Sequence, residues 1–389
     1  MHFFKKKQED PNPQLTQIEL IDGMIHAEHT MLDKYSGLKV GKTVHIINVP
    51  IILNGKEEYI HTVRCGDDQK EDLVLLHGYL VGMVSFFGML KDLSQHYRVW
   101  CFDLIGMGLS SRPEFTCQST EETVDYFVDS IEQWRQKVGI ERFHMVGQSF
   151  GGYMSGMYAL RYPERVKKLI LMSPAGVTRP GNPEEVAEGL KKFSFLKRQA
   201  IKLASSIWAK KYTPHVVVGK LGPLKNLFLK GYVKRTNLKG EEFELGCRYI
   251  SSIFKLPEST LKALHYILTV PRAAGCLPLE DKMPLLKMPI EIYYGDRDWM
   301  SSEGAYRVAA SGQAKVRIHI IPNAGHIMNF ENPEHIIKLM AEHKLKEDEE
   351  IEVNYSHSLK ENVVDLETEK ELHLISEENI ISTKAAPVS

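Results

Sequence analysis

The chain has 389 residues, of which 43% are hydrophobic and 25% are charged, and its formal net charge at pH 7 is −1. These values are typical of globular proteins, so they exclude disorder or a fibrous repeat for most of the length. The near-zero net charge argues against a protein that binds nucleic acid through its overall field.

Residues 1–42 form a polar N-terminal extension, in which we expect one helix at about residues 14–34. The first residues, MHFFKKKQEDPNPQ, include a short basic stretch but no apolar run of signal-peptide length. Nowhere do about eighteen apolar residues run without a charge, so the sequence contains no candidate transmembrane helix. We therefore expect a cytoplasmic protein whose contact with membranes or lipid droplets, if there is any, is peripheral.

Short β-branched and aromatic runs alternate with stretches of helical period from Val44 onward. This alternation predicts an α/β fold, in which a mostly parallel sheet is flanked by helices. Residues 120–138 have apolar side chains at three- and four-residue spacing and are expected to form one amphipathic helix. Eight strands are expected, at residues 45–53, 58–65, 72–78, 97–103, 143–149, 166–174, 290–296 and 316–322.

The stretch between the sixth and seventh expected strands is too long for one crossover connection. We expect a helical cap at residues 179–283, inserted into an α/β core that consists of residues 43–178 and 284–345. The tail, residues 346–389, is rich in Glu and Asp and has little apolar periodicity, so we expect it to be disordered.

The segment Gly147-Gln148-Ser149-Phe150-Gly151 follows an expected strand and precedes a helical run, as a nucleophile elbow requires. Small residues two positions before and after the serine let strand and helix approach closely, and the strained turn exposes the hydroxyl. A glycine-rich turn with an incidental serine is the competing interpretation. The order of the partners along the chain, serine then aspartate then histidine, favours catalysis.

The acid and the base of a catalytic triad are expected after the last two strands. Asp296 and Asp298 follow the seventh strand, and we expect Asp298 to be the catalytic acid because of its spacing from Gly295. Asp296 is expected to bind backbone N–H groups of a turn. His326 lies in a loop after the eighth strand, where its neutral imidazole is placed to take the proton of Ser149.

An acyl-transfer site also needs donors for the developing oxyanion. We expect these to be the backbone N–H groups of Phe150, directly after the nucleophile, and of Tyr79, in the loop after the third strand. His77 is interpreted as a structural histidine. The cysteines are widely spaced and form no metal-binding pattern, so we expect no metal, no cofactor and a reducing compartment. They are Cys65, Cys101, Cys117, Cys247 and Cys276.

Residues 191–240, within the insertion, contain thirteen Lys or Arg residues and no Asp or Glu. Apolar side chains are interleaved with them. Basic heads beside apolar anchors suit an anionic lipid surface or a phosphate-bearing substrate. A solvated basic cap that balances acidic segments elsewhere explains the same pattern, and both interpretations stay open. The interleaved residues include Phe193, Phe195, Leu196, Ile201, Trp208, Leu227 and Phe228.

Several stretches between residues 45 and 345 resemble the CGI-58-type family of α/β-hydrolases, in particular its plant and protist members. They are LLHGYLVG, FDLIGMGLSSRPEF, GQSFGGYMSGMYALRYPERVKKLILMSPAGVTRP, IYYGDRDWMSSEGA and the AGH loop before Ile327. The resemblance implies an α/β-hydrolase fold. It also implies a lipid substrate, which is a phospholipid, a lysophospholipid or an acylglycerol at a membrane or lipid-droplet surface.

The resemblance leaves three functions open. We predict a serine esterase or lipase that works through an acyl-enzyme on Ser149. Some relatives lack the nucleophile and act as non-catalytic lipase activators on lipid droplets, whereas this chain keeps it. The third function is an acyl-CoA-dependent lysophosphatidic acid acyltransferase, with acyl-CoA as co-substrate. The family's H-x4-D element, which is associated with that activity, reads His326-Ile-Met-Asn-Phe-Glu331 here, with glutamate in place of aspartate.

Overall fold

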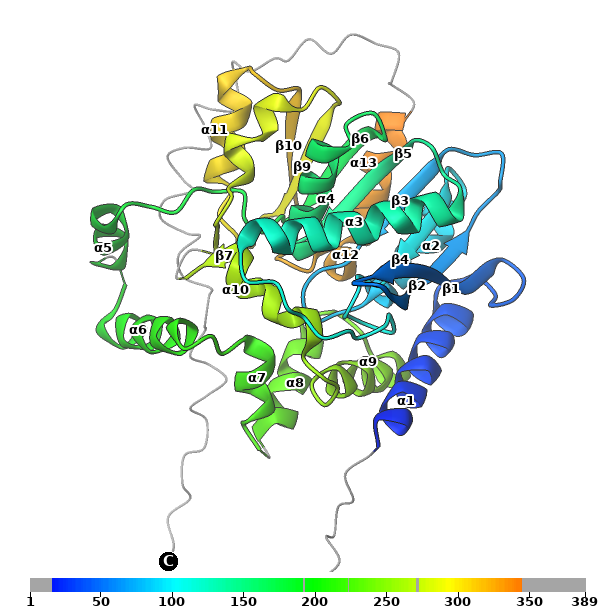
Figure 1. Ribbon diagram of the computed structural model, residues 1–389, viewed down its shortest axis with the longest axis horizontal. Helices are drawn as coiled ribbons and strands as arrows, with labels where there is room; N and C mark the ends of the chain where they lie inside the picture. The colour runs from blue at the N-terminus through cyan, green and yellow to red at the C-terminus, as the bar shows by residue number, and fades with distance from the viewer. Residues whose placement is uncertain (1–15, 192, 223, 271–272, 345–389) are drawn as a thin grey trace, which may run out of the picture.

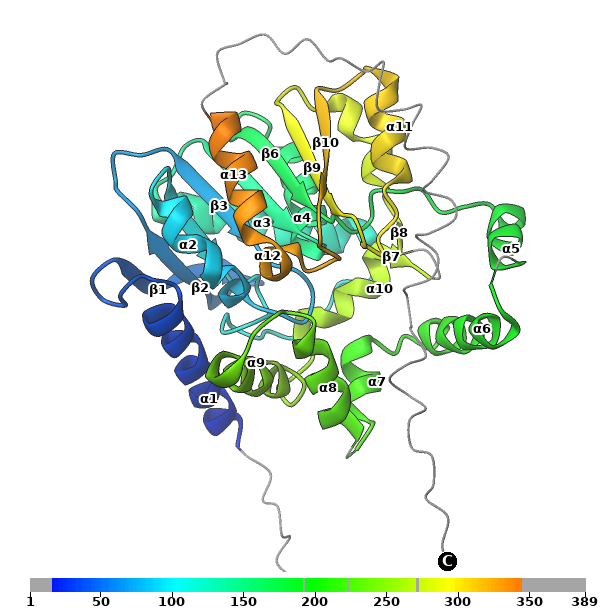
Figure 2. The ribbon, with the colours of Figure 1, turned by 180° about the vertical axis from the view of Figure 1, so that it is seen from behind.

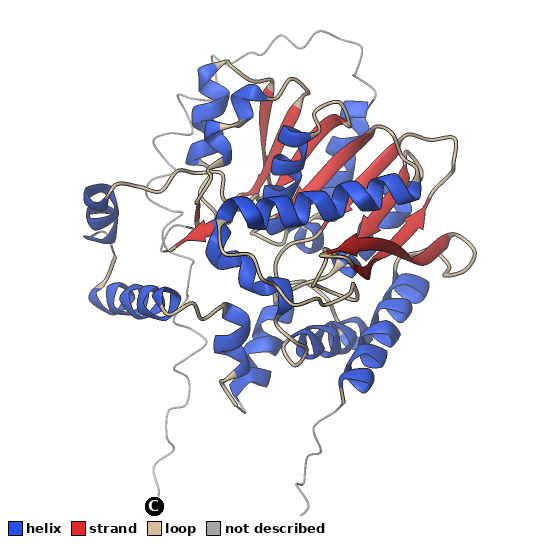
Figure 3. Cartoon of the chain, in the orientation of Figure 1, coloured by secondary structure: helices blue, strands red, loops and turns tan. Residues whose placement is uncertain are grey.

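An eight-stranded sheet with helices on both faces forms the body of the protein (Figures 1 and 3). The computed structural model describes residues 16–344, apart from residues 192, 223 and 271–272. The order of the strands is β1-β2-β4-β3-β5-β6-β9-β10, in which β2 is antiparallel to both of its neighbours and the other pairs are parallel. The predicted fold and its eight strands are confirmed, each end lying within two residues of its predicted position. The bounds are β1 (Val44–Leu53), β2 (Lys56–Cys65), β3 (Asp72–Leu76), β4 (Arg98–Phe102), β5 (Phe143–Gln148), β6 (Val166–Met172), β9 (Ile290–Gly295) and β10 (Val316–Ile321).

Helices on both faces explain why the central strands are continuous apolar runs in the sequence. Every residue of β3, β5 and β9 is buried. Helices α3 and α4 cover the face seen in Figure 1, and α2 and α13 cover the opposite face, seen in Figure 2. These helices and their neighbours are η2 (Met83–Phe86), α2 (Phe87–Ser94), α3 (Thr120–Val138), α4 (Phe150–Arg161), α11 (Glu303–Ser311), α12 (Met328–Glu331) and α13 (Pro333–Lys344).

Helix α3 begins and ends where its sequence predicts. The hydroxyl of Ser119 accepts the backbone N–H of Glu122 and so caps the first turn, while Gly139 takes the left-handed conformation that ends the helix. Phe127 and Trp134, which belong to its apolar stripe, are fully buried. The stripe fixes which side of α3 faces the sheet.

The insertion between β6 and β9 forms a helical cap on one side of the sheet (Figure 1). None of the helices within the described residues is both long enough and apolar enough to cross a membrane. The elements of the cap are α5 (Pro183–Lys191), α6 (Phe195–Ala209), α7 (Pro214–Gly219), α8 (Leu224–Lys234), α9 (Gly240–Ile253), η3 (Ser259–Ala263), α10 (Leu264–Ile267), β7 (Leu268–Thr269), β8 (Ala274–Gly275), η4 (Leu279–Asp281) and η5 (Met283–Leu285).

The N-terminal extension contributes to the core, although its sequence is polar on average. Helix α1 (Gln17–Thr30) starts at a capping box and continues into a π-helical turn, η1 (Met31–Tyr35). Its apolar residues Leu20, Met24 and Ala27 are buried, and α1 packs beside α9 of the cap. The expected disordered tail lies outside the described residues.

Candidate active site

The segment around Ser149 forms a sharp turn between β5 and α4. Ser149 has a φ of 53° and a ψ of −114°, in a region that non-glycine residues rarely adopt. Gly151 allows this turn, because a Cβ there would lie 2.4 Å from the carbonyl oxygen of His77. This strained backbone conformation is the one that the sequence predicts for a nucleophile elbow.

His326 reaches Ser149 from the loop after β10. Its Nε2 lies 3.0 Å from Ser149 Oγ, which is hydrogen-bonding distance. Two hydrogen bonds hold the loop in place: Gln148 Nε2 donates to the His326 carbonyl over 3.1 Å, and Gly325 N–H donates to Glu331 Oε2 over 2.7 Å. Glu331, the acidic residue of the H-x4-D element, therefore supports the backbone next to the histidine.

Two groups face the other ring nitrogen of His326. Asp298 Oδ1 lies 3.3 Å from His326 Nδ1, and the hydroxyl of Ser173 lies 2.6 Å from the same atom. Ser173 was not predicted. It directly follows β6, the neighbour of β5, so its place at the carboxyl end of an adjacent parallel strand was the available signal.

The carboxylate of Asp298 is buried next to this histidine, with its side chain only 2% exposed. Burial alone raises the pKa of Asp298, but the hydrogen bond and charge of His326 oppose it. Further hydrogen bonds from Ser173 and from the backbone of Met300 act in the same direction, and the net result is a lowered pKa. Asp298 is thus held as an anion where it can orient and stabilise an imidazolium.

Asp296, the other acidic candidate, faces away from this arrangement. Its two carboxylate oxygens accept the backbone N–H groups of Asn323 and Ala324, at 2.8 and 3.0 Å. Asp296 therefore shapes the turn that leads to His326, as expected, and the structure brings Asp298 rather than Asp296 to the imidazole.

The two residues expected to supply the oxyanion donors lie close to the serine in the structure. Phe150 is the first residue of α4, and the first N–H groups of a helix have no partner within the helix. The loop that carries Tyr79 lies against the nucleophile, since a Cβ on Gly78 would be 3.2 Å from Ser149 Cβ. The phenol of Tyr79 donates to the carbonyl of Leu261 over 3.1 Å, and Tyr79 lines the same cavity as Ser149.

The side chain of His77 is hydrogen-bonded to the backbone of this loop and of the segment after β4. Its Nε2 accepts the N–H of Leu104 over 3.0 Å, so its Nδ1 carries the proton and donates to Gly78 O over 2.7 Å. Complete burial lowers the pKa of His77 to about 4. His77 is thus a neutral structural histidine, as expected.

A small cavity adjoins the serine and the histidine. Its volume is about 30 Å³. Tyr232, from helix α8 of the cap, lies in its wall, as does Asn329, whose amide donates to Ser85 O over 2.8 Å. The complete lining is Tyr79, Val81, Ser85, Gln148, Ser149, Tyr232, His326, Ile327, Asn329 and Phe330.

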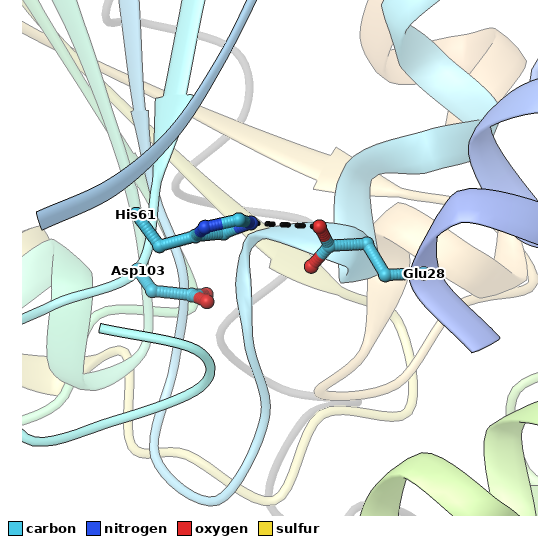
Figure 4. Close-up of side chains that lie close together, drawn as sticks. All are labelled: Glu28, His61 and Asp103. Atoms are coloured by element: carbon cyan, nitrogen blue, oxygen red, sulfur yellow. Dashed lines mark hydrogen bonds and ion pairs between the residues drawn. The ribbon is translucent and has the colours of Figure 1, made fainter. Parts of the chain in front are cut away.

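A second buried polar cluster joins α1 to the sheet (Figure 4). Among the described residues, Glu28, His61 and Asp103 are the group whose potential metal-ligand atoms lie within 4.8 Å of one another. His61 already bonds Glu28 through Nε2 and Asn48 through Nδ1, both over 2.8 Å. Because protein groups already engage both ring nitrogens, we interpret the cluster as a structural network.

Comparison with known proteins finds relatives of this chain in sequence and in fold. The sequence profile described as "alpha/beta hydrolase fold" matches residues 73–204. A protein of Arabidopsis thaliana named "1-acylglycerol-3-phosphate O-acyltransferase" is 34% identical over 291 residues, which cover 72% of this chain and 68% of that protein. The human "(Lyso)-N-acylphosphatidylethanolamine lipase" is 40% identical over 126 residues, which cover 32% of this chain and 36% of the lipase. The fold matches that of carboxylesterase CesB from Bacillus subtilis with a TM-score of 0.58 at 16% identity, covering 84% of this chain and 96% of that one.

Proposed function

Because the chain belongs to the CGI-58-type family of α/β-hydrolases, we propose that it is a serine esterase that cleaves carboxylic esters of lipids. The observation that carries the proposal is the hydrogen-bonded series Ser149–His326–Asp298, with a strained serine at its start. The substrate class is a phospholipid, a lysophospholipid or an acylglycerol. The names of the relatives support lipid esters as this class.

In the proposed reaction, Nε2 of neutral His326 takes the hydroxyl proton of Ser149 while Oγ attacks the ester carbonyl. The backbone N–H groups of Phe150 and Tyr79 stabilise the oxyanion. His326 then protonates the leaving alcohol, and an acyl-enzyme remains on Ser149. Water, deprotonated by His326, releases the fatty acid and restores the serine.

The anion of Asp298 is the group that makes this proton transfer favourable. It fixes the Nδ1–H tautomer, so that Nε2 points its lone pair at the serine, and it stabilises the imidazolium that forms. Ser173 shares the same Nδ1–H and hydrogen-bonds to Asp298, so we propose it as a positioning residue.

Acyl transfer to a lysophospholipid is the second candidate function. The name of the Arabidopsis relative favours it, because that protein is named for transfer to a 1-acylglycerol 3-phosphate. Both functions share the acyl-enzyme and differ in the acceptor, which is water in one and the hydroxyl of the lysophospholipid in the other.

The experiment that tests the proposal supplies the purified chain with a panel of lipid esters, and separately with acyl-CoA and lysophosphatidic acid. We expect fatty acid release from at least one lipid ester, and Ser149→Ala should lower that rate by at least about 10³-fold with an unchanged melting temperature. Phosphatidic acid formed faster than free fatty acid would favour the transferase. Undiminished turnover in Ser149→Ala would refute the acyl-enzyme for either acceptor.

A further inference from the structure

Helix α8 has apolar side chains on two opposite faces. Leu229 and Val233 are buried against the cap. Leu224, Leu227 and Phe228, at positions i, i+3 and i+4, form a stripe on the exposed side. A helix that only packs against the rest of the cap needs one apolar face. The second, exposed stripe therefore requires another explanation.

Helix α6 shows the same feature more strongly. None of its residues is buried, although its sequence, FLKRQAIKLASSIWA, is rich in apolar residues. Phe195, Leu196 and Leu203 are exposed, and both ribbon views show α6 standing away from the sheet (Figures 1 and 2). At its C-terminal end, the ring of Trp208 lies 4.2 Å from that of His265, which ties this end to the rest of the cap.

We define the docking face as the six exposed large apolar residues of α6 and α8: Phe195, Leu196, Leu203, Leu224, Leu227 and Phe228. Each is between 52% and 72% exposed. Isolated exposed apolar residues are common on soluble proteins, whereas several such residues on two helices of one cap indicate a binding surface.

The charge around the docking face identifies the kind of partner. The segment that contains it, residues 191–240, has thirteen Lys or Arg residues and no carboxylate side chain. Lys202 on α6 and Lys230 on α8 are exposed beside the apolar side chains. Cationic heads next to exposed Leu and Phe side chains complement a layer of anionic head groups above acyl chains.

We propose that the docking face binds the surface of an anionic lipid bilayer, with α6 and α8 lying in the head-group region. Such docking brings the chain to its lipid substrate, and in this respect it rests on the proposed function. It also connects docking to the catalytic site, because Tyr232 lies one turn beyond Phe228 on α8 and forms part of the wall of the catalytic cavity.

Because that cavity measures only about 30 Å³, we expect α8 to shift when a lipid reaches Ser149. Docking supplies the driving force, because it moves the exposed stripe of α8 from water into the lipid. Anionic vesicles should therefore accelerate the hydrolysis of a water-soluble short-chain ester as well.

The test measures sedimentation of the full chain with vesicles of phosphatidylcholine, with and without phosphatidylserine. We expect binding to the anionic vesicles that weakens with added salt. The double variant Leu227→Gln/Phe228→Gln should bind them at least about tenfold less tightly. Leu285→Gln is the matched control, because Leu285 is 69% exposed outside the docking face, and it should bind like the wild type.

Each outcome decides the proposal. Equal binding by the double variant and the wild type overturns it, and so does equal binding to neutral and anionic vesicles. A wild type that self-associates, with a monomeric double variant and no vesicle binding by either, shows that the docking face binds a second copy instead. Ser149→Ala should bind vesicles like the wild type, so a failure of the esterase proposal and a failure of docking give different results.

Discussion

The imidazole of His326 has different partners on its two nitrogens, and this asymmetry defines its chemistry. Nε2 faces Ser149 at 3.0 Å, while Nδ1 faces Ser173 at 2.6 Å and Asp298 at 3.3 Å. A neutral imidazole that donates through Nδ1 is left with its lone pair on the side of the nucleophile. The sequence predicted Ser149, Asp298 and His326 from their order and spacing. It did not predict Ser173, whose contact depends on how the ends of β6, β9 and β10 converge.

Two aspartates that stand two residues apart should respond differently to the same substitution. Asp298→Asn should lower kcat by about 10⁴-fold, since an amide favours the wrong tautomer of His326. Asp296→Asn should retain most of kcat and lower the free energy of unfolding by about 1–3 kcal/mol, since the amide accepts only one of the two turn N–H groups. Steady-state kinetics and urea unfolding of both variants check this. The reverse pattern would show that the acid was assigned to the wrong residue.

Ser173→Ala should have a smaller effect than Asp298→Asn. Without the hydroxyl, Asp298 accepts the Nδ1–H alone, so we expect kcat to fall by about 3–10-fold. The acid limb of the kcat–pH profile should also move to higher pH. The hydrogen bond from Ser173 helps to lower the pKa of Asp298, so its loss raises that pKa. An unchanged kcat together with an unchanged profile would contradict a positioning role.

At the scale of elements, burial determined what the sequence could reveal. The strands were predictable because those covered on both faces are continuous apolar runs, and α3 because it has one apolar stripe and clear caps. Helix α1 was predicted as a helix, but its packing beside α9 was not, because the two segments are far apart in the sequence. Residues that meet only through such packing, such as Glu28 and His61, carry no local signal.

The cluster under α1 should make stability depend on pH. Burial and the nearby charge of Glu28 raise the pKa of Asp103 to about 7. Burial alone lowers the pKa of His61, but its hydrogen bond to Glu28 and the charge of that residue raise the pKa above its usual value. Both groups hold a proton more tightly in the folded chain than in the unfolded chain. The contribution of these two groups to the free energy of unfolding is therefore complete at low pH. It is lost as the pH rises through about 7.

Urea unfolding at about pH 5.5 and about pH 8 measures this effect. We expect Asp103→Asn to remove part of the decrease that the wild type shows, even though the substitution lowers stability at both pH values. The test compares how much the free energy of unfolding falls between the two pH values, not its value at either pH. The lost carboxylate also accepts the N–H groups of Met83 and Leu109, so the substitution lowers stability at both. An equal decrease in both proteins would show that Asp103 does not titrate in this range.

At the scale of the whole molecule, the sheet positions Ser149, Asp298 and His326, and the inserted cap contributes Tyr232 to the cavity beside them. The basic character of the insertion can be read from the sequence. The direction in which each cap helix faces could not be predicted, because an apolar stripe is the same in sequence whether it meets a core or a lipid. Only the structure shows that Leu227 and Phe228 face outward while Tyr232 reaches the cavity beside Ser149.

The most direct measurement of the central claim is labelling with a small fluorophosphonate, followed by peptide mass spectrometry. An activated serine reacts with this probe, whereas ordinary serines do not. We predict one adduct, on the peptide that contains Ser149, formed in buffer or in detergent micelles, and its loss in both Ser149→Ala and His326→Ala. Wild-type protein that stays unlabelled in both media, or an adduct that persists in His326→Ala, would contradict an acyl-enzyme mechanism at this site.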